Sequence, residues 1–245
     1  MSVVRQYRDL VSMQLRSMRG DVGFIILIHV ALTLGLVVGM GFLIPDVSDS
    51  TALFLITGTA TQSFVTVGLV MLPQMIAESK ERGRLEYFLT MPISREAYLL
   101  SLITVVAITS LPAVAFCLVF GAWHYDISFA VEPAFIAVMV LAVVSLAGVG
   151  VVMAVYTPHL QVVNALTQLI IFYVLFFSPV LLPESQLPEA LRYTAMLAPP
   201  TYAADGVRAT LTDLPDTNLA RDLVFMSGAA CASIALSAFA IRRRG

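Results

Sequence analysis

The residues that could act in acid–base or nucleophilic catalysis or bind a metal are scattered along this sequence. The three histidines, His29, His124 and His159, lie far apart in the sequence, and no ligand spacing brings them together. Cys117 and Cys231 both fall within apolar stretches, where a cysteine is usually a small buried hydrophobic residue. We therefore expect no metal-binding site and no catalytic residues.

The chain also lacks the residues that bind and hydrolyse a nucleotide. No glycine-rich run ends in the Gly-Lys-Ser/Thr of a phosphate-binding loop, and Lys80 is the only lysine. If ATP drives this protein, ATP and Mg²⁺ must bind to a separate ATPase chain. The net charge of −2 gives no basic surface for nucleic acid.

Polar but uncharged side chains inside apolar stretches are better candidates for a binding surface. They are Thr59, Gln62, Ser63 and Thr66 in one stretch, and Asn164 and Gln168 in another. In lipid such groups either join helices through hydrogen bonds or line a cavity, and the sequence leaves both interpretations open. His29 has the same two interpretations, since it either lines a pathway or bonds to a neighbouring helix.

Charged residues are concentrated in residues 78–96, between two long apolar stretches. This segment holds four of the fourteen basic residues, in a chain with only 12% charged residues. Ionised side chains are costly in hydrocarbon, so the segment must lie outside the membrane core. A short amphipathic helix at this place could contact a soluble partner.

Composition defines the class of protein that carries these groups. Hydrophobic residues make up 59% of the 245 residues, and the mean hydropathy is +0.90, too apolar for a soluble domain of this size. Six stretches are long enough for a membrane-spanning helix of about 20 residues: Val22–Ile44, Ala52–Ala77, Ala97–Phe120, Ala134–Val155, Val162–Leu182 and Leu223–Ile241. We predict an all-α integral membrane protein with six transmembrane helices, because lipid requires backbone polar groups to be paired within each helix.

The basic residues are distributed unevenly between the two sides of these spans. Eleven of the fourteen lie before the first span, between the second and third, or after the sixth. The loops Pro45–Ser50 and Gly121–Pro133, on the other side, carry no Lys or Arg. Cytoplasmic loops carry the excess of Lys and Arg, so we expect both termini to face the cytoplasm, in the cell membrane.

Two segments outside the spans also have helical patterns. Residues 1–20 have apolar side chains at helical spacing and arginines on the other face, which predicts a helix lying flat in the membrane interface rather than an ordinary juxtamembrane segment. Residues 183–215 contain repeated prolines and two short amphipathic pieces, Glu189–Leu197 and Tyr202–Leu211. We interpret these pieces as re-entrant outer helices rather than as a plain extracellular loop. We expect residues 1–245 to form a single transmembrane domain.

Two sequence motifs resemble the membrane subunit of type-2 ABC exporters, a permease family that includes drug, polysaccharide and haem exporters. The first is Glu78…Glu81-Arg82-Gly83-Arg84-Leu85-Glu86…Met91-Pro92-Ile93-Ser94-Arg95. The second is Pro179…Leu182-Pro183-Glu184…Leu187-Pro188…Leu191-Arg192, then Ala198-Pro199-Pro200-Thr201-Tyr202-Ala203…Gly206-Val207-Arg208. The resemblance covers nearly the whole chain. It departs from the family pattern at Arg84, where a small residue such as Thr is frequent.

The resemblance implies a non-catalytic subunit that forms half of a transmembrane pathway with a second copy or a homologous permease. The first, second and fifth spans would lie near the interface and the pathway. The cargo would be a hydrophobic or amphiphilic molecule, drug-like or lipid-like, because the six candidate pathway residues named above are polar and uncharged.

Separate ATPase subunits would drive such a permease through a cytoplasmic coupling helix within residues 78–96. The residues assigned to this contact are Glu78, Glu81, Arg82, Gly83, Leu85, Glu86 and Phe88. The charged ones could pair with charges on the ATPase, Gly83 would permit close backbone approach, and Leu85 and Phe88 would supply an apolar anchor.

Two other classes of membrane protein remain alternatives. An ion-coupled secondary transporter usually exposes a carboxylate within the membrane, whereas every acidic residue here lies in a loop or at a boundary. An intramembrane protease needs a nucleophilic serine with a partner histidine. Ser227 is the nearest candidate for that serine, and no suitable histidine accompanies it.

Overall fold

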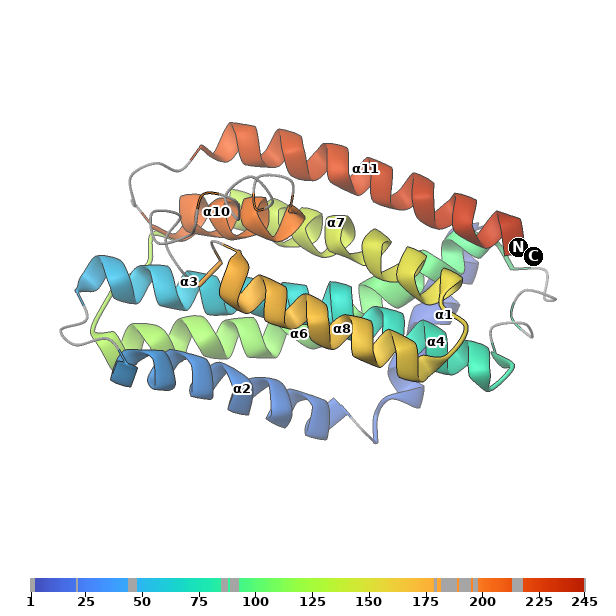
Figure 1. The fold of residues 1–245 in the computed structure, drawn as a ribbon, viewed down its shortest axis with the longest axis horizontal. Helices are drawn as coiled ribbons and strands as arrows, with labels where there is room; N and C mark the ends of the chain where they lie inside the picture. Colours follow the sequence, from blue (N-terminus) through green and yellow to red (C-terminus); the bar gives the residue numbers. More distant parts are fainter. Residues whose placement is uncertain are drawn as a thin grey trace.

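All the regular structure in the described part of the chain is helical. The structure is a computed structural model, and it describes residues 3–20, 22–43, 48–84, 88, 93–178, 180–181, 189, 195, 198–212 and 218–244. The helices are α1 (Val3–Ser17), α2 (Val22–Leu43), α3 (Asp49–Thr66), η1 (Val67–Met71), α4 (Leu72–Glu81), α6 (Arg95–Tyr125), α7 (Ala134–Tyr156), α8 (Leu160–Phe177), α10 (Pro199–Leu211) and α11 (Leu219–Arg244). The longer ones run roughly along one axis (Figure 1).

The prediction of an all-helical membrane protein is confirmed. Within the described residues, five helices are long and apolar enough to cross a membrane: α2, the continuous rod α3–η1–α4, α6, α7 and α11. Helix α8 is apolar as well but shorter, with Leu160–Phe176 as its apolar part. A sixth span, which the sequence predicts over Val162–Leu182, stays a prediction.

The predicted second span is a rod with a π-turn, η1, between α3 and α4. Pro73 of α4 has no N–H, and its ring would clash with a carbonyl one turn earlier in a regular α-helix. The wider turn relieves that clash: the N–H of Leu72 donates to Val67 O, five residues earlier. Gly68 within η1 packs on Leu146 of α7 so closely that there is no room for a Cβ. The π-turn is therefore also a contact between the rod and α7.

Helix α7 packs against α10, α11, η1 and α4. Its Gly148 lies directly on Ser233 of α11, and the Ser233 hydroxyl donates to Val144 O at 2.7 Å. Lipid is as apolar as the side chains of these helices, so hydrophobic burial gives little drive for their association. Close packing at small residues and hydrogen bonds such as this one hold the bundle together instead.

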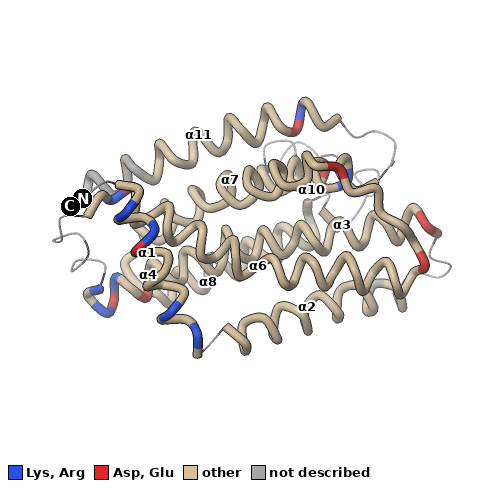
Figure 2. Tube along the Cα trace, turned by 180° about the vertical axis from the view of Figure 1, so that it is seen from behind, with Lys and Arg blue, Asp and Glu red and all other residues tan. Residues whose placement is uncertain are grey.

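The two ends of the bundle differ in charge (Figure 2). Lys and Arg gather where α1, the last turn of α4 and the first turn of α6 lie, which we call the basic end. Helix α1 confirms the helix predicted within residues 1–20. It packs on α6, with a hydrogen bond from Gln14 Nε2 to Ser101 Oγ at 2.9 Å, and its Leu10 is buried. Whether α1 lies in the membrane interface stays a prediction.

The opposite end of the bundle contains α10 and the beginning of α11 (Figure 1). Helix α10 confirms that the predicted piece Tyr202–Leu211 is helical, and the helix begins earlier, at Pro199. Proline fits there because the N–H groups of the first helical positions have no hydrogen-bond acceptor within the helix. The other predicted piece, Glu189–Leu197, lies almost entirely outside the described residues.

Candidate functional site

The polar residues of two predicted spans lie around one cavity of about 410 Å³, which we call the polar cavity. It is lined by Ile28, His29, Leu32, Thr33 and Leu36 of α2, by Thr59, Gln62, Ser63, Thr66 and Val70 of the rod, and by Gln168, Ile171 and Leu175 of α8. Five of the six predicted pathway residues thus line a single cavity. The sixth, Asn164, is exposed one turn before Gln168 and is not part of the lining.

Helical periodicity explains why these side chains converge. Thr59, Gln62, Ser63 and Thr66 occupy positions i, i+3, i+4 and i+7, which lie on one face of a helix. On α8 the lining residues Gln168, Ile171 and Leu175 follow the same kind of spacing. The cavity is therefore formed where the polar stripe of the rod faces α2 and α8. His29 of α2 also lines this cavity.

The hydroxyl groups on this stripe use their protons within the rod. Thr59 Oγ1 donates to Leu55 O at 2.8 Å, and Thr66 Oγ1 donates to Gln62 O at 2.9 Å. Ser63 Oγ makes a longer bond of 3.4 Å to Thr59 O. A hydroxyl has a single proton, so toward the cavity these oxygens are left as acceptors while the bonds persist.

Two buried polar atoms at the polar cavity, Gln62 Oε1 and His29 Nδ1, have no hydrogen-bond partner among the described residues. A buried polar atom without a partner costs about 1–3 kcal/mol, and such atoms are rare in folded proteins. No Asp, Glu, Lys or Arg is found among the thirteen residues that line the cavity. The cavity combines a largely apolar wall with a few neutral hydrogen-bonding groups, which fits a ligand of the same character.

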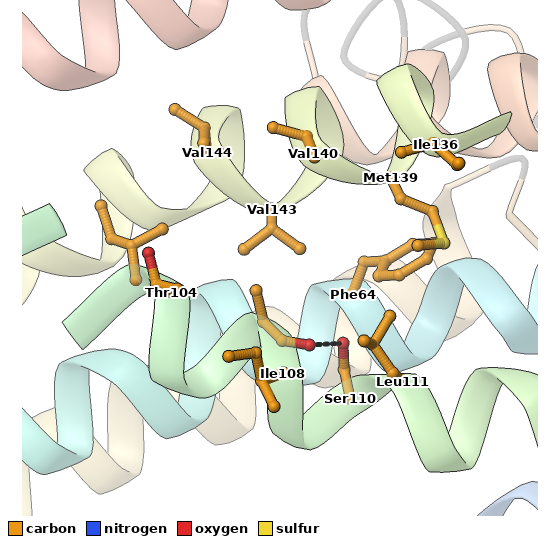
Figure 3. A pocket seen from close by; sticks show the side chains of 12 residues that line it. Phe64, Thr104, Ile108, Ser110, Leu111, Ile136, Met139, Val140, Val143 and Val144 are labelled. Atoms are coloured by element: carbon orange, nitrogen blue, oxygen red, sulfur yellow. Dashed lines mark hydrogen bonds between the residues drawn. The ribbon is translucent and has the colours of Figure 1, made fainter. Parts of the chain in front are cut away.

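A second cavity, of about 320 Å³, lies between α6 and α7, with Phe64 of the rod reaching into it (Figure 3). Its lining is apolar apart from Thr104 and Ser110, whose hydroxyls donate within α6 to Leu100 O and Ala107 O, each at 2.8 Å. Large apolar side chains such as Ile136 are exposed beside it. This cavity has the character of a lipid-facing groove, since the two hydroxyls among its described lining residues already donate within α6.

The residues predicted to contact an ATPase begin inside the rod. Glu78 and Glu81 belong to the last turn of α4, so the helix of the second span continues into the charged segment until Gly83 ends it. Gly83 has a φ of 68°, and its N–H donates to Lys80 O at 3.0 Å. A Cβ at Gly83 would meet open space, so within this chain it is the left-handed backbone that requires glycine. Leu85 and Glu86 lie outside the described residues.

The charged side chains of this turn pair with one another. Arg82 Nη2 lies 2.7 Å from Glu78 Oε1, and Arg84 Nη2 lies 4.0 Å from the same atom. The Arg82 side chain is 65% exposed, and such exposed pairs contribute less than about 1 kcal/mol, so they exchange readily for other partners. Phe88, in contrast, is half-buried and stacks on Tyr98 of α6, with 5.0 Å between the ring centroids.

Two neighbouring residues of the same turn, Lys80 and Glu81, bind another part of the chain, a contact that the sequence does not predict. Lys80 Nζ donates to Val155 O at 3.2 Å and to Thr157 O at 2.9 Å, at the end of α7. Glu81 Oε1 accepts a hydrogen bond of 2.6 Å from the N–H of Leu160, the first residue of α8. These partners are 75 to 79 residues apart in the sequence, so no local pattern reveals them.

Arg208 of α10 is the centre of a network at the end opposite the basic residues. Its side chain is buried and donates to Asp205 Oδ1 at 3.0 Å and to Val180 O at 2.5 Å, while it lies 3.6 Å from the centroid of the Phe54 ring. Burial lowers the pKa of Arg208 to about 10 and Asp205 opposes that shift, so the side chain stays charged at neutral pH. Asp205 also lies 3.5 Å from Arg221 of α11. The network ties α10 to α3 and α11.

Comparison with known proteins places these features in one family. No curated protein matches the chain. The family model described as ABC-2 type transporter matches residues 5–212, a range that includes the three walls of the polar cavity, the charged turn of α4 and the buried Arg208. This match confirms the resemblance that the two sequence motifs indicate. The chain therefore belongs to the ABC-2 type transporter family.

Proposed function

We propose that this chain is the permease subunit of an ATP-driven exporter in the cell membrane, with six transmembrane helices including α8 and with both termini in the cytoplasm. Two such subunits, identical or homologous, form the pathway. Separate ATPase subunits bind ATP and Mg²⁺ and supply the energy, so the permease itself catalyses no reaction. The cargo is a hydrophobic or amphiphilic small molecule, drug-like or lipid-like.

The polar cavity is the observation that carries this proposal. A cargo that crosses a bilayer loses its hydrogen bonds to water, and its path must replace some of them without binding the cargo too tightly. A neutral wall with a few hydrogen-bonding groups does so. The unpartnered Gln62 Oε1 and His29 Nδ1 are available to such a cargo. A polyanion would find no cationic side chain among the residues that line the cavity.

The exposed polar face of α8 supports the pairing with a second subunit. Asn164 and Gln168 are exposed in the single chain, on a helix that otherwise exposes apolar residues such as Leu169 and Phe172. Amide groups facing hydrocarbon are costly, whereas across a subunit interface they find hydrogen-bond partners or water. The charged turn with Glu78 and Arg82 lies at the basic end, the end that the positive-inside rule assigns to the cytoplasm and thus to the ATPase.

The test is transport by the purified permease and its partner ATPase in proteoliposomes, with a fluorescent lipophilic amine as the probe. ATP should drive movement of the probe, and the double variant with Gln62→Leu and Ser63→Ala should reduce that movement roughly five- to tenfold, because about one hydrogen bond of binding energy is lost. Val140→Leu, in the apolar groove between α6 and α7, is the matched control and should transport normally. Movement driven by a proton or sodium gradient without any ATPase would instead establish a secondary transporter and overturn the proposal.

A further inference from the structure

Two consecutive side chains of α4 hold the turn between α7 and α8, residues 157–159. Lys80 Nζ donates to Val155 O and Thr157 O at 3.2 and 2.9 Å, and Glu81 Oε1 accepts from the Leu160 N–H at 2.6 Å. One turn of the rod thus binds both the end of one helix and the beginning of the next. We call this pair of contacts the α4 clamp.

Each side chain of the α4 clamp matches the charge of the helix end that it binds. The last carbonyls of a helix have no intrahelical partner and carry partial negative charge, which suits the Lys80 ammonium at the end of α7. The first N–H groups of a helix carry partial positive charge, which suits the Glu81 carboxylate at the beginning of α8. His159, the residue before α8, makes no side-chain capping bond, so Glu81 acts as a cap supplied by another helix. All three bonds of the clamp involve a charged side chain and are therefore stronger than bonds between neutral groups.

A second contact joins α4 to α8 between the clamp and the polar cavity. Gln74 Nε2 lies 3.4 Å from Thr167 Oγ1, about two turns from each of the clamp contacts. Thr167 immediately precedes Gln168, which lines the cavity. The path from the charged turn to the cavity wall therefore consists of contacts between two helices, α4 and α8.

Resting on the proposed function, we propose that the α4 clamp transmits movement of the charged turn, driven by the ATPase, to α8 and so to one wall of the polar cavity. Lys80 and Glu81 are positioning residues in this proposal, because neither contacts the cargo. Glu78 and Arg82 of the same segment pair with each other, with side chains 40% and 65% exposed, and are the ones placed to contact the ATPase. The end of α4, the end of α7 and the beginning of α8 then move as one body.

The first measurement is the number of probe molecules moved per ATP hydrolysed by the reconstituted complex. Lys80→Met removes the ammonium but keeps an unbranched side chain, and it should lower this ratio roughly fivefold or more while the ATPase still copurifies. Lys80→Arg keeps the charge and the donors and should restore most of the ratio. If Lys80→Met does not assemble, Lys80→Gln, with a donor but no charge, replaces it and should show a smaller loss.

The second measurement is hydrogen exchange of the first-turn amides of α8, which needs no ATPase. Glu81→Ala should speed exchange at Leu160, whereas Glu81→Gln, which keeps an oxygen acceptor, should preserve most of the protection. An unchanged exchange rate in Glu81→Ala would show that the cap is not formed and would overturn the clamp directly.

The outcomes separate this inference from the proposed function. If the wild-type complex moves no probe with ATP, the proposed function fails and the transmission role fails with it. If the wild type transports and Lys80→Met keeps the wild-type ratio, only the clamp is overturned. A ratio that falls in Lys80→Met and recovers in Lys80→Arg, with exchange protection lost in Glu81→Ala, supports it.

Discussion

Some polar side chains of this protein bond to another segment of the chain, whereas others have no hydrogen-bond partner among the described residues. Ser233 donates from α11 to Val144 O of α7, and Arg208 donates from α10 to Val180 O, so each fixes the relative position of two segments. Gln62 Oε1 and His29 Nδ1, in contrast, are buried and have no partner within the described residues. Bonds such as those of Ser233 and Arg208 stabilise the packing of the helices. The unpaired atoms of Gln62 and His29 are instead suited to binding a ligand.

Replacing the buried arginine of α10 should destabilise the protein far more than replacing an exposed arginine of α1. Arg208→Met leaves Val180 O without its donor and removes the charge beside Asp205, and we expect a loss of about 3 kcal/mol in the free energy of unfolding. Arg8→Met of α1 removes a side chain that is 76% exposed beside the exposed Asp9, and the expected loss is below about 1 kcal/mol. Denaturant unfolding in detergent measures both. Equal losses would contradict the central role given to Arg208.

At the scale of the helices, the sequence predicts the features that depend only on residues close together in the chain. The apolar stretches predict α2, α6 and α7 to within a few residues, because each stretch must form a helix in lipid. The polar stripe of α3 is equally local, since a spacing of three and four residues defines one helix face. That is why five of six predicted pathway residues lie in one cavity.

Features that depend on other helices could not be predicted in this way. The onset of charge at Glu78 marks the edge of the hydrocarbon, whereas the helix continues until Gly83 provides a left-handed residue. The sequence alone therefore suggests a boundary where the structure has none. The bonds of Lys80 to the end of α7 and of Arg208 to Val180 O join distant segments, and no spacing within either segment indicates them.

The contact between α7 and α11 should depend on the absence of a side chain at Gly148. A Cβ there would overlap Ser233, including its backbone, so Gly148→Val must push the two helices apart. We expect a loss of about 1–3 kcal/mol in the free energy of unfolding, seen as a lower thermal midpoint in detergent. Gly228→Val is the control, because the structure shows open space around Gly228 and the midpoint should hardly change. A similar loss in both variants would contradict this, because it would show that the close contact at Gly148 is not what makes the substitution costly.

In the whole molecule, the charged turn and the polar cavity lie at different positions along the long axis. The rod α3–η1–α4 has 33 residues, which corresponds to roughly 50 Å of helix, whereas the hydrocarbon core of a bilayer is about 30 Å thick. A rod that crosses the hydrocarbon core therefore extends beyond it. One projecting end carries the α4 clamp and the exposed Arg82, and the middle of the rod lines the polar cavity. A single continuous helical element thus connects the basic end with the wall of the cavity.

This arrangement predicts which residues a membrane-impermeant maleimide reaches in intact cells. The protein would first carry Cys231→Ala, because Cys231 is exposed whereas Cys117 is buried. Ser50→Cys and Asn218→Cys, both exposed at the end opposite the basic residues, should be labelled from outside. Ser17→Cys, at the end of α1, should react only after the cells are permeabilised, because the positive-inside rule assigns that end to the cytoplasm. Labelling of Ser17→Cys in intact cells would reverse the orientation, and it would place the charged turn of α4 where no ATPase could reach it.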